Sequence, residues 1–545
     1  MATEEILRKT LKNADGKPFA KYKNIQNSFV LEDFEIFFDD VQNDRAGHTA
    51  VRVRVPMKKA GFPEDTFSTK TREIALRDLI ARRFWESART HARSPIPKTD
   101  GGEVFIPRPG QEILERWSVV ITQFYVETRF TVDLPSAGGK VSASAMETLI
   151  FERISTIVSE SMHYGSYKQS KLYNHLFTAE NAEFIRDNLE KRGLVAFIAD
   201  GSILPRRDDD LAPMTDAVAF GCADRLRVTF EVPNGDPVSG IGIPAGITVL
   251  AGGPRSGRSA ILDAVFSGVY DHIPGDGREG VISLADTAFV ISEPGRASDS
   301  VDISMFAKDS GEFGESSAAK ADSVCAPYSD LVSLSEYIEM GSKLILMDEE
   351  YVSPETLRRG FMDSDGPITP LSESCRSISA AGISMIVATG DASMAEACDN
   401  VVIVRGFVNS ENIANGHDPA EPIPMPNERY PVSKGIVYEK GRKEVSVSAS
   451  SVRGVEIGTF VCNSPMAAVF DMSQTRTIAD CIAAAKDIMD GSRTMREVCA
   501  MSIDMVKTAD QAKDSTSGMW HSKVRPVDLA SFLNRHPQML CIQRR

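Results

Sequence analysis

Residues 252–259 have the types and spacing of a loop that binds phosphate. They read Gly-Gly-Pro-Arg-Ser-Gly-Arg-Ser, with Arg258 where the pattern expects lysine. An apolar run at 247–251 precedes the loop and a helix-like segment at 260–266 follows it, which is the strand–turn–helix setting of such loops. Backbone N–H groups at a helix start bind phosphate oxygens, and Ser259 falls where the Mg²⁺-binding hydroxyl belongs. The alternative is a glycine turn that matches by coincidence.

Arg258 decides which chemistry this loop can perform. Lysine reaches the β- and γ-phosphates of a nucleotide as a slim point charge, whereas arginine is wider, planar and forked. The exchange is therefore not conservative in a tight phosphate cradle. Two hypotheses follow: Arg258 serves as an altered phosphate clamp in a working enzyme, or the chain binds nucleotide weakly and its hydrolysis is impaired or lost.

Two adjacent carboxylates lie further along the chain, where the segment 343–350 reads as a buried strand that ends in acidic residues. Ligands of open α/β sheets bind at the carboxyl ends of the strands. We therefore expect Asp348 to hold Mg²⁺ and Glu349 to orient or deprotonate the attacking water. The alternative is that Asp348, Glu349 and Glu350 simply end a strand at the surface.

A sheet must position these groups. The apolar runs 383–388 and 401–404 read as two more buried strands beside 247–251 and 343–350. Continuous apolar runs separated by helices predict an α/β fold with a mostly parallel sheet covered on both faces. Segments rich in Gly, Ser, Pro and Asn at 295–330 and 408–435 predict surface loops.

The parts before and after this core differ from it. Strands are predicted at 34–38, 51–55, 119–126 and 129–132, and helices at 70–93 and 146–158, which together indicate an α+β N-terminal domain. A polar linker is expected near 163–175, and the last segment is α-rich. The expected domains are 1–170, 176–450 and 455–545.

Composition excludes several classes of protein. The chain has 545 residues, 42% of them hydrophobic, yet no apolar run approaches the ~18–20 residues that span a bilayer. The acidic N-terminus lacks an apolar signal core, and the eight cysteines show no metal-binding spacing, so we expect an intracellular, soluble protein that does not bind membrane. The net charge of −15 argues against a chain coated in nucleic acid.

The N-terminal part is nevertheless locally basic. Residues 1–120 carry 21 Lys and Arg against 18 Asp and Glu. In the helix 70–93, Arg82, Arg83 and Arg89 surround Trp85, and arginine beside an aromatic ring suits RNA. The arginines alternate with acidic residues, however, so a solvated face with ion pairs is the alternative.

Several longer strings of residues carry a resemblance to a known family. The chain resembles the family called "ATPase of the ABC class", which includes a kinetoplastid mitochondrial RNA-binding complex subunit. The similarity extends over the whole chain, and the string 268–279 is the most specific part of it. The strings are 200–206, 252–259, 268–279, 301–304 and 367–370, and in the N-terminal part 41–44, 51–55, 108–114 and 134–135.

The resemblance implies a family-specific N-terminal domain, an ABC-ATPase-like P-loop core and a helical C-terminal region. It implies ATP and Mg²⁺ at a site shared by a homodimer, and RNA binding for some members. The expected site residues are Gly252, Gly253, Gly257, Arg258, Ser259, Ala260 and Asp348 for the nucleotide, Ser259 and Asp348 for Mg²⁺, and Glu349 for catalysis.

Other positions depart from the family pattern. The serine-glycine signature should fall at 325–329, where the pair is missing and Pro327 removes a backbone donor. Ala260 replaces the usual threonine, no glutamine lies between 259 and 348, and no histidine follows the strand 383–388. We therefore expect a divergent ATPase-like protein with weak or lost hydrolysis. An active Mg-ATPase that couples ATP-driven dimerisation to RNA or partner binding, and a non-catalytic scaffold, remain as alternatives.

Overall fold

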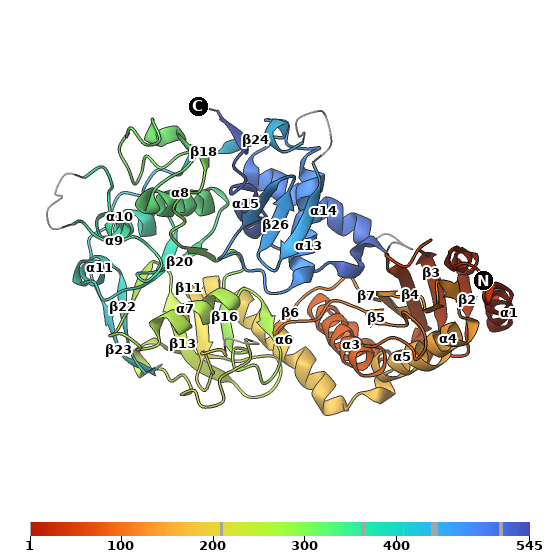
Figure 1. Cartoon of the computed structure of the whole chain (residues 1–545). Helices are drawn as coiled ribbons and strands as arrows, with labels where there is room; N and C mark the ends of the chain where they lie inside the picture. Colours follow the sequence, from red (N-terminus) through yellow and green to blue (C-terminus); the bar gives the residue numbers. More distant parts are fainter. Residues whose placement is uncertain are drawn as a thin grey trace. The chain divides into compact units, whose positions relative to one another are not determined.

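A computed structural model gives the fold, and it describes residues 2–207, 211–360, 366–406, 408–437, 445–511 and 516–544. The contacts divide the chain into two compact units (Figure 1). Unit 1 comprises Met1–Ala179 with Lys507–Lys523, and unit 2 comprises Glu180–Val506 with Val524–Arg545. Each unit is described by itself below.

Unit 1 is built on a seven-stranded sheet in the order β1-β2-β3-β4-β8-β5, with β7 also paired to β8. The central strands β4 and β8 pair antiparallel over their whole length, from Thr49 opposite Val132 to Pro56 opposite Tyr125. The strands are β1 (Ala2–Thr3), β2 (Ser28–Val30), β3 (Glu35–Asp40), β4 (Thr49–Pro56), β5 (Val104–Phe105), β7 (Val119–Ile121) and β8 (Tyr125–Val132).

Helices cover this sheet. The long helix α3 (Lys70–His91) packs against β5, β7 and α5 (Ser155–Ser161), as Figure 1 shows. Its N-terminus is capped by Thr69, whose hydroxyl accepts a hydrogen bond from the Arg72 N–H. The helix expected at 146–158 is present as α4 (Ala143–Glu147), a π-helical turn η3 (Thr148–Ile154) and α5. The expected linker near 163–175 is in part helical, because α6 (Gln169–Leu189) begins within it.

Unit 2 contains the predicted sheet, with six strands in the order β17-β20-β21-β14-β22-β23. All the described pairs from β17 to β22 are parallel, and β23 pairs antiparallel with β22. The expected α/β fold with a mostly parallel sheet is therefore confirmed. The strands are β14 (Ile247–Ala251), β17 (Ala288–Val290), β20 (Leu344–Asp348), β21 (Ser384–Ala388), β22 (Asn400–Arg405) and β23 (Val408–Ala414).

Three helices pack against the central strands β14 and β21: α7 (Arg258–Ser267), α10 (Leu371–Ala380) and α11 (Ala392–Ala397). A second, antiparallel sheet has the order β12-β13-β11-β16. Its strands are β11 (Leu194–Ala199), β12 (Arg227–Phe230), β13 (Val238–Pro244) and β16 (Val281–Ser283). The segments expected as loops contain short strands, namely β18 (Ser298–Val301), β19 (Ala319–Ala321), β23 and β24 (Arg429–Val432).

The C-terminal segment shares the core of unit 2. Its elements are β25 (Val447–Ser451), β26 (Gly454–Ile457), β27 (Phe460–Asn463), α13 (Met472–Ala485), α14 (Met495–Gln511), α15 (Pro526–Leu533) and β28 (Leu540–Gln543). Buried side chains of α13 and α15, such as Ile478 and Phe532, belong to one apolar cluster with Val249 and Met347 of the parallel sheet. The contacts thus group residues 455–506 and 524–545 with the sheet, and the expected three-domain division stays a prediction.

Candidate nucleotide site

The glycine-rich loop joins β14 to α7, as the sequence predicts. Gly257 precedes the helix with φ of 102°, a left-handed conformation that glycine adopts without strain. A side chain at Gly252 would place its Cβ 2.6 Å from Ser256 Oγ and 2.7 Å from the Val404 carbonyl oxygen, so the chain approaches itself too closely for any other residue. Gly253 faces open space. The loop therefore has the close backbone path that a phosphate cradle needs.

The strand register brings the loop and the acidic residues to one edge of the sheet. Asp348 lies opposite Ala388, and Ala388 lies opposite Leu250 at the end of β14. Because the three strands are parallel, their carboxyl ends meet at this edge. The structure thus places Arg258, Asp348 and Glu349 together, and their roles in binding and catalysis stay predictions.

Arg258 is tied to Glu349. The guanidinium Nη2 of Arg258 donates to Glu349 Oε1 at 2.8 Å. The Arg258 side chain is 8% exposed and that of Glu349 is 31% exposed, so the ion pair is largely shielded from water. The expected phosphate clamp and the expected catalytic base therefore neutralise one another in this structure.

Two further donors hold the other oxygen of Glu349. Thr389 Oγ1 donates to Oε2 at 2.7 Å, and the Gly390 N–H donates to the same oxygen at 2.9 Å. Burial by itself raises the pKa of Glu349, but these two hydrogen bonds and the charge of Arg258 outweigh it and lower the pKa below the ordinary value. Glu349 is consequently ionised at neutral pH and is a weaker base than an ordinary glutamate.

Three buried polar atoms at this edge lack a partner within the described residues: Arg258 Nη1, Asp348 Oδ2 and Ser256 Oγ. The other oxygen of Asp348, Oδ1, accepts from the Glu350 N–H at 3.0 Å. Buried polar groups are almost always hydrogen-bonded, so these three atoms would suit a ligand that supplies the missing partners. A free guanidinium N–H suits a phosphate oxygen, and a free carboxylate oxygen suits Mg²⁺.

The remaining expected positions lie on nearby elements. Ser259 and Ala260 are in the first turn of α7. The segment 325–329 forms the start of α8 (Ala326–Glu339), where Pro327 occupies the first turn. Sequence reasoning missed Thr389 and Gly390 as partners of Glu349. The available signal was their place directly after the predicted strand 383–388, at the same edge as Glu349.

The three N-terminal arginines lie in unit 1 and differ in their contacts. Arg82 is held by Asp78 at 2.5 Å and by the carbonyl oxygens of Gly110 and Glu112, so it serves the structure of the domain. Arg83 lies 3.4 Å from Glu86 in an exposed ion pair. Arg89 is exposed, and its guanidinium lies 5.5 Å from the centre of the Trp85 ring. Among these three, only Arg89 faces solvent without a carboxylate in the described part of the chain.

Within the described residues, no helix is long and apolar enough to cross a membrane.

Comparisons with known proteins place the chain. A family model described as "P-loop domain" of ABC ATPases matches residues 168–430, and one described as "ATPase of the ABC class N-terminal" matches residues 4–165. An uncharacterised protein of Methanocaldococcus jannaschii is 28% identical over 193 residues, which are 33% of this chain and 43% of that protein. The chain thus matches less than half the length of this curated relative.

Two solved structures are similar at low identity. One is a dimeric, post-hydrolysis ATP-binding cassette bound to ADP and Pi, with 10% identity over 35% of this chain and 97% of that chain. The other is cbiO1 of Clostridium perfringens, part of an ABC transporter complex, with 15% identity over 40% of this chain and 88% of that chain. Both have a TM-score of 0.23. Together the two family matches extend from residue 4 to residue 430, and the chain belongs to the family of ATPases of the ABC class, with an ABC-type P-loop domain.

Proposed function

We propose that this protein binds ATP with Mg²⁺ at the loop 252–259 and hydrolyses it weakly or not at all. The observation that carries the proposal is the ion pair between Arg258 and Glu349. This single contact engages both the phosphate clamp and the catalytic base. Glu349 and the Nη2 group of Arg258 are therefore occupied by one another, whereas Nη1 of Arg258 stays available for a phosphate oxygen.

The residues of the site fit the nucleotide and the cation. The loop N–H groups and the free Nη1 of Arg258 would bind phosphate oxygens. Ser259 and Asp348 would hold Mg²⁺, a hard cation that prefers oxygen ligands. When bound, Mg²⁺ would neutralise part of the charge of the phosphates.

Several residues that the family pattern uses for ATP hydrolysis are absent from this chain. Phosphoryl transfer depends on positioning and on stabilisation of developing charge. Arg258 replaces the lysine of the loop, and the proline-containing start of α8 replaces the serine-glycine signature. No histidine follows the strand 383–388. Each ~1.4 kcal/mol of lost stabilisation slows turnover about tenfold, so the combined losses predict slow or absent turnover.

Equilibrium dialysis with labelled ATP tests the binding. We expect saturable binding that requires Mg²⁺, because Asp348 would hold the cation and the cation would neutralise phosphate charge. Asp348→Asn should weaken the Mg²⁺-dependent binding by about tenfold or more, corresponding to ~1.4 kcal/mol. Asp322→Asn, an exposed acid of the same unit, is the matched control and should bind as the wild type does. Absence of saturable binding at millimolar ATP would favour the non-catalytic scaffold instead.

An active Mg-ATPase is the alternative. It draws support from Asp348 and Glu349, which stand at the positions that the family uses for Mg²⁺ and for the base. ATP would then displace Arg258 from Glu349, and two copies of the chain would pair around the nucleotide as a homodimer, coupling hydrolysis to RNA or partner binding.

RNA binding by unit 1 is a second proposed function. The observation that favours it is Arg89, exposed and beside the indole of Trp85. Arg82 and Arg83 have carboxylate partners, so we expect them to contribute less than Arg89. Phosphate contacts make such binding weaken steeply as salt rises, which a titration at several salt concentrations measures.

A further inference from the structure

We infer that a pocket at the C-terminal end of α3 binds one nucleoside phosphate, either as a free mononucleotide or as one unit of a single strand. The pocket lies within unit 1 and is separate from the P-loop site. If the ligand is one unit of a single strand, the inference rests on the RNA proposal above. If the ligand is a free mononucleotide, the inference stands independently.

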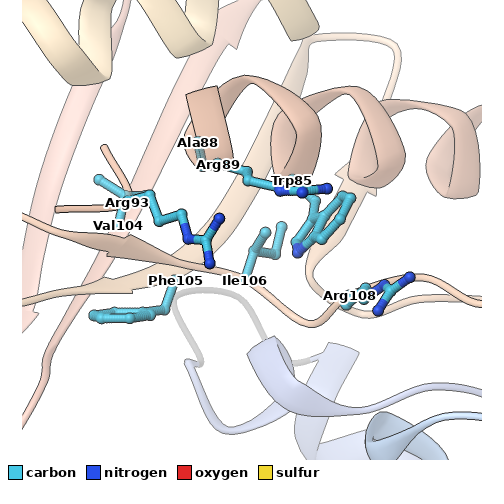
Figure 2. A pocket seen from close by; sticks show the side chains of 8 residues that line it. All are labelled: Trp85, Ala88, Arg89, Arg93, Val104, Phe105, Ile106 and Arg108. Carbon is cyan, nitrogen blue, oxygen red and sulfur yellow. The ribbon is translucent and has the colours of Figure 1, made fainter. Parts of the chain in front are cut away.

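The described residues that line the pocket come from two short stretches of chain. Its volume is about 430 Å³, within the range of ~300–1,000 Å³ typical of small-molecule sites. Figure 2 shows Trp85 and Arg89 extending from the helix, with Arg93 just beyond it, toward the stretch that carries Phe105 and Arg108. Apolar side chains complete the lining. The space is large enough for one base, its sugar and a phosphate.

Regular elements hold these side chains in place. Trp85 and Arg89 are four residues apart on α3, so they lie on one face of the helix, and Arg93 continues this spacing two residues after the helix ends at His91. Phe105 ends the strand β5 and pairs with Thr131 of β8. The pocket is therefore built on a helix and a sheet edge, which favours a site that exists before the ligand arrives.

The described lining of the pocket is positively charged. Arg89, Arg93 and Arg108 are exposed, and no acidic side chain is among the described residues that line the pocket. In the described part of the chain these three arginines have no carboxylate partner, in contrast to Arg82 and Arg83. In a chain with a net charge of −15, three unpaired guanidinium groups around one cavity indicate an anionic ligand. The forked guanidinium suits phosphate in particular.

The aromatic groups further limit the class of ligand that would fit the pocket. The guanidinium groups of Arg89 and Arg108 each lie 5.5 Å from the centre of the Trp85 ring, and Trp85 itself is partly exposed. Phe105 is also partly exposed. Flat bases stack on aromatic rings and on arginine planes. The Phe105 ring already lies 5.0 Å from that of His48, so Trp85 is the ring on which a base would stack. A bare phosphate would not use Trp85, and a duplex would hide its base faces, so a single nucleoside phosphate matches both the arginines and the indole.

Calorimetry and fluorescence anisotropy on the full chain test this inference. The probes are uridine monophosphate, for calorimetry, and a labelled 12-nucleotide oligouridine, for anisotropy. We expect Arg93→Ser/Arg108→Ser to weaken binding of at least one probe by tenfold or more, and Trp85→Leu to weaken it by fivefold or more. Lys9→Ser/Lys12→Ser removes the same charge from exposed positions on α1 (Glu4–Ala14) and should change binding by less than twofold. Thermal melts confirm that each variant is folded.

The outcomes separate this inference from the RNA proposal. Pocket-dependent binding of the mononucleotide, with no binding of the oligonucleotide, supports the inference and counts against RNA. Pocket-dependent binding of the oligonucleotide supports both. Oligonucleotide binding that the pocket variants leave unchanged overturns the inference but keeps the RNA proposal. Absence of binding to either probe overturns both.

Discussion

At position 258 the length and shape of arginine explain the contact seen in the site. The forked guanidinium presents several N–H groups in one plane, so it donates to Glu349 through Nη2 while Nη1 remains available. A lysine ammonium is a compact charge on a flexible stem and has no such preference for a carboxylate across the site. The exchange therefore favours an ion pair with Glu349 through Nη2 and leaves Nη1 for a phosphate oxygen.

Arg258→Lys should restore part of the nucleotide site. A lysine at this position would contact Glu349 less well and reach the phosphates as a point charge, so we expect ATP to bind about tenfold more tightly, or ~1.4 kcal/mol. Equilibrium dialysis with Mg-ATP measures the change. Arg376→Lys, at an exposed position of α10 in the same unit, is the control and should leave the affinity unchanged. Equal affinities of Arg258→Lys and wild type would show that the ion pair does not limit binding.

The sequence could predict the loop, Asp348 and Glu349, because each follows a recognisable apolar strand. It could not predict the ion pair, since the pair joins the first residue of α7 to the end of β20 through side-chain conformations. It also could not predict that Thr389, at the end of a neighbouring strand, donates a hydrogen bond to Glu349 through its hydroxyl.

At the scale of elements, β4 and β8 hold a buried cluster of charges. Arg52 and Arg54 are 2% and 8% exposed, and both contact Glu127, which is 1% exposed. Arg129 also donates to Glu127, at 2.8 Å. The sequence shows only that apolar and basic residues alternate at 51–55. Arg52 also donates to Asp39 at 2.7 Å. Glu127, the acid that the arginines share, comes from a strand more than seventy positions away, so the pattern alone could not predict it.

Removing the charge of Glu127 should destabilise unit 1. Glu127→Gln leaves three buried arginines with one fewer counter-charge, and breaking such a buried pair costs about 3–5 kcal/mol. Urea unfolding, followed by tryptophan fluorescence, measures the change, because all three tryptophans of the chain belong to unit 1. Glu5→Gln, an exposed acid on α1, should change the free energy of unfolding by less than about 0.5 kcal/mol. A loss below about 1 kcal/mol for Glu127→Gln would mean that other groups compensate the arginines.

At the scale of the whole molecule, the periodicity of apolar residues predicted the strands of the parallel sheet. It did not predict which compact unit the C-terminal segments would join. The buried strands 343–350, 383–388 and 401–404 correspond to β20, β21 and β22. The C-terminal helices were recognisable as amphipathic, but an apolar stripe on a helix does not specify which other elements the helix packs against. In the structure, Ile478 and Leu529 join the core of unit 2, whereas residues 507–523 belong to unit 1.

Steady-state hydrolysis of Mg-ATP by the full chain, beside the Glu349→Gln variant, tests the central claim most directly. If Arg258 and Glu349 hold one another in an unproductive pair, wild-type turnover should stay within a few-fold of the variant. Turnover of ~1 s⁻¹ or more, within the usual range of enzymes, that disappears in Glu349→Gln would contradict the proposal. It would show instead that Arg258 replaces lysine in a working ATPase.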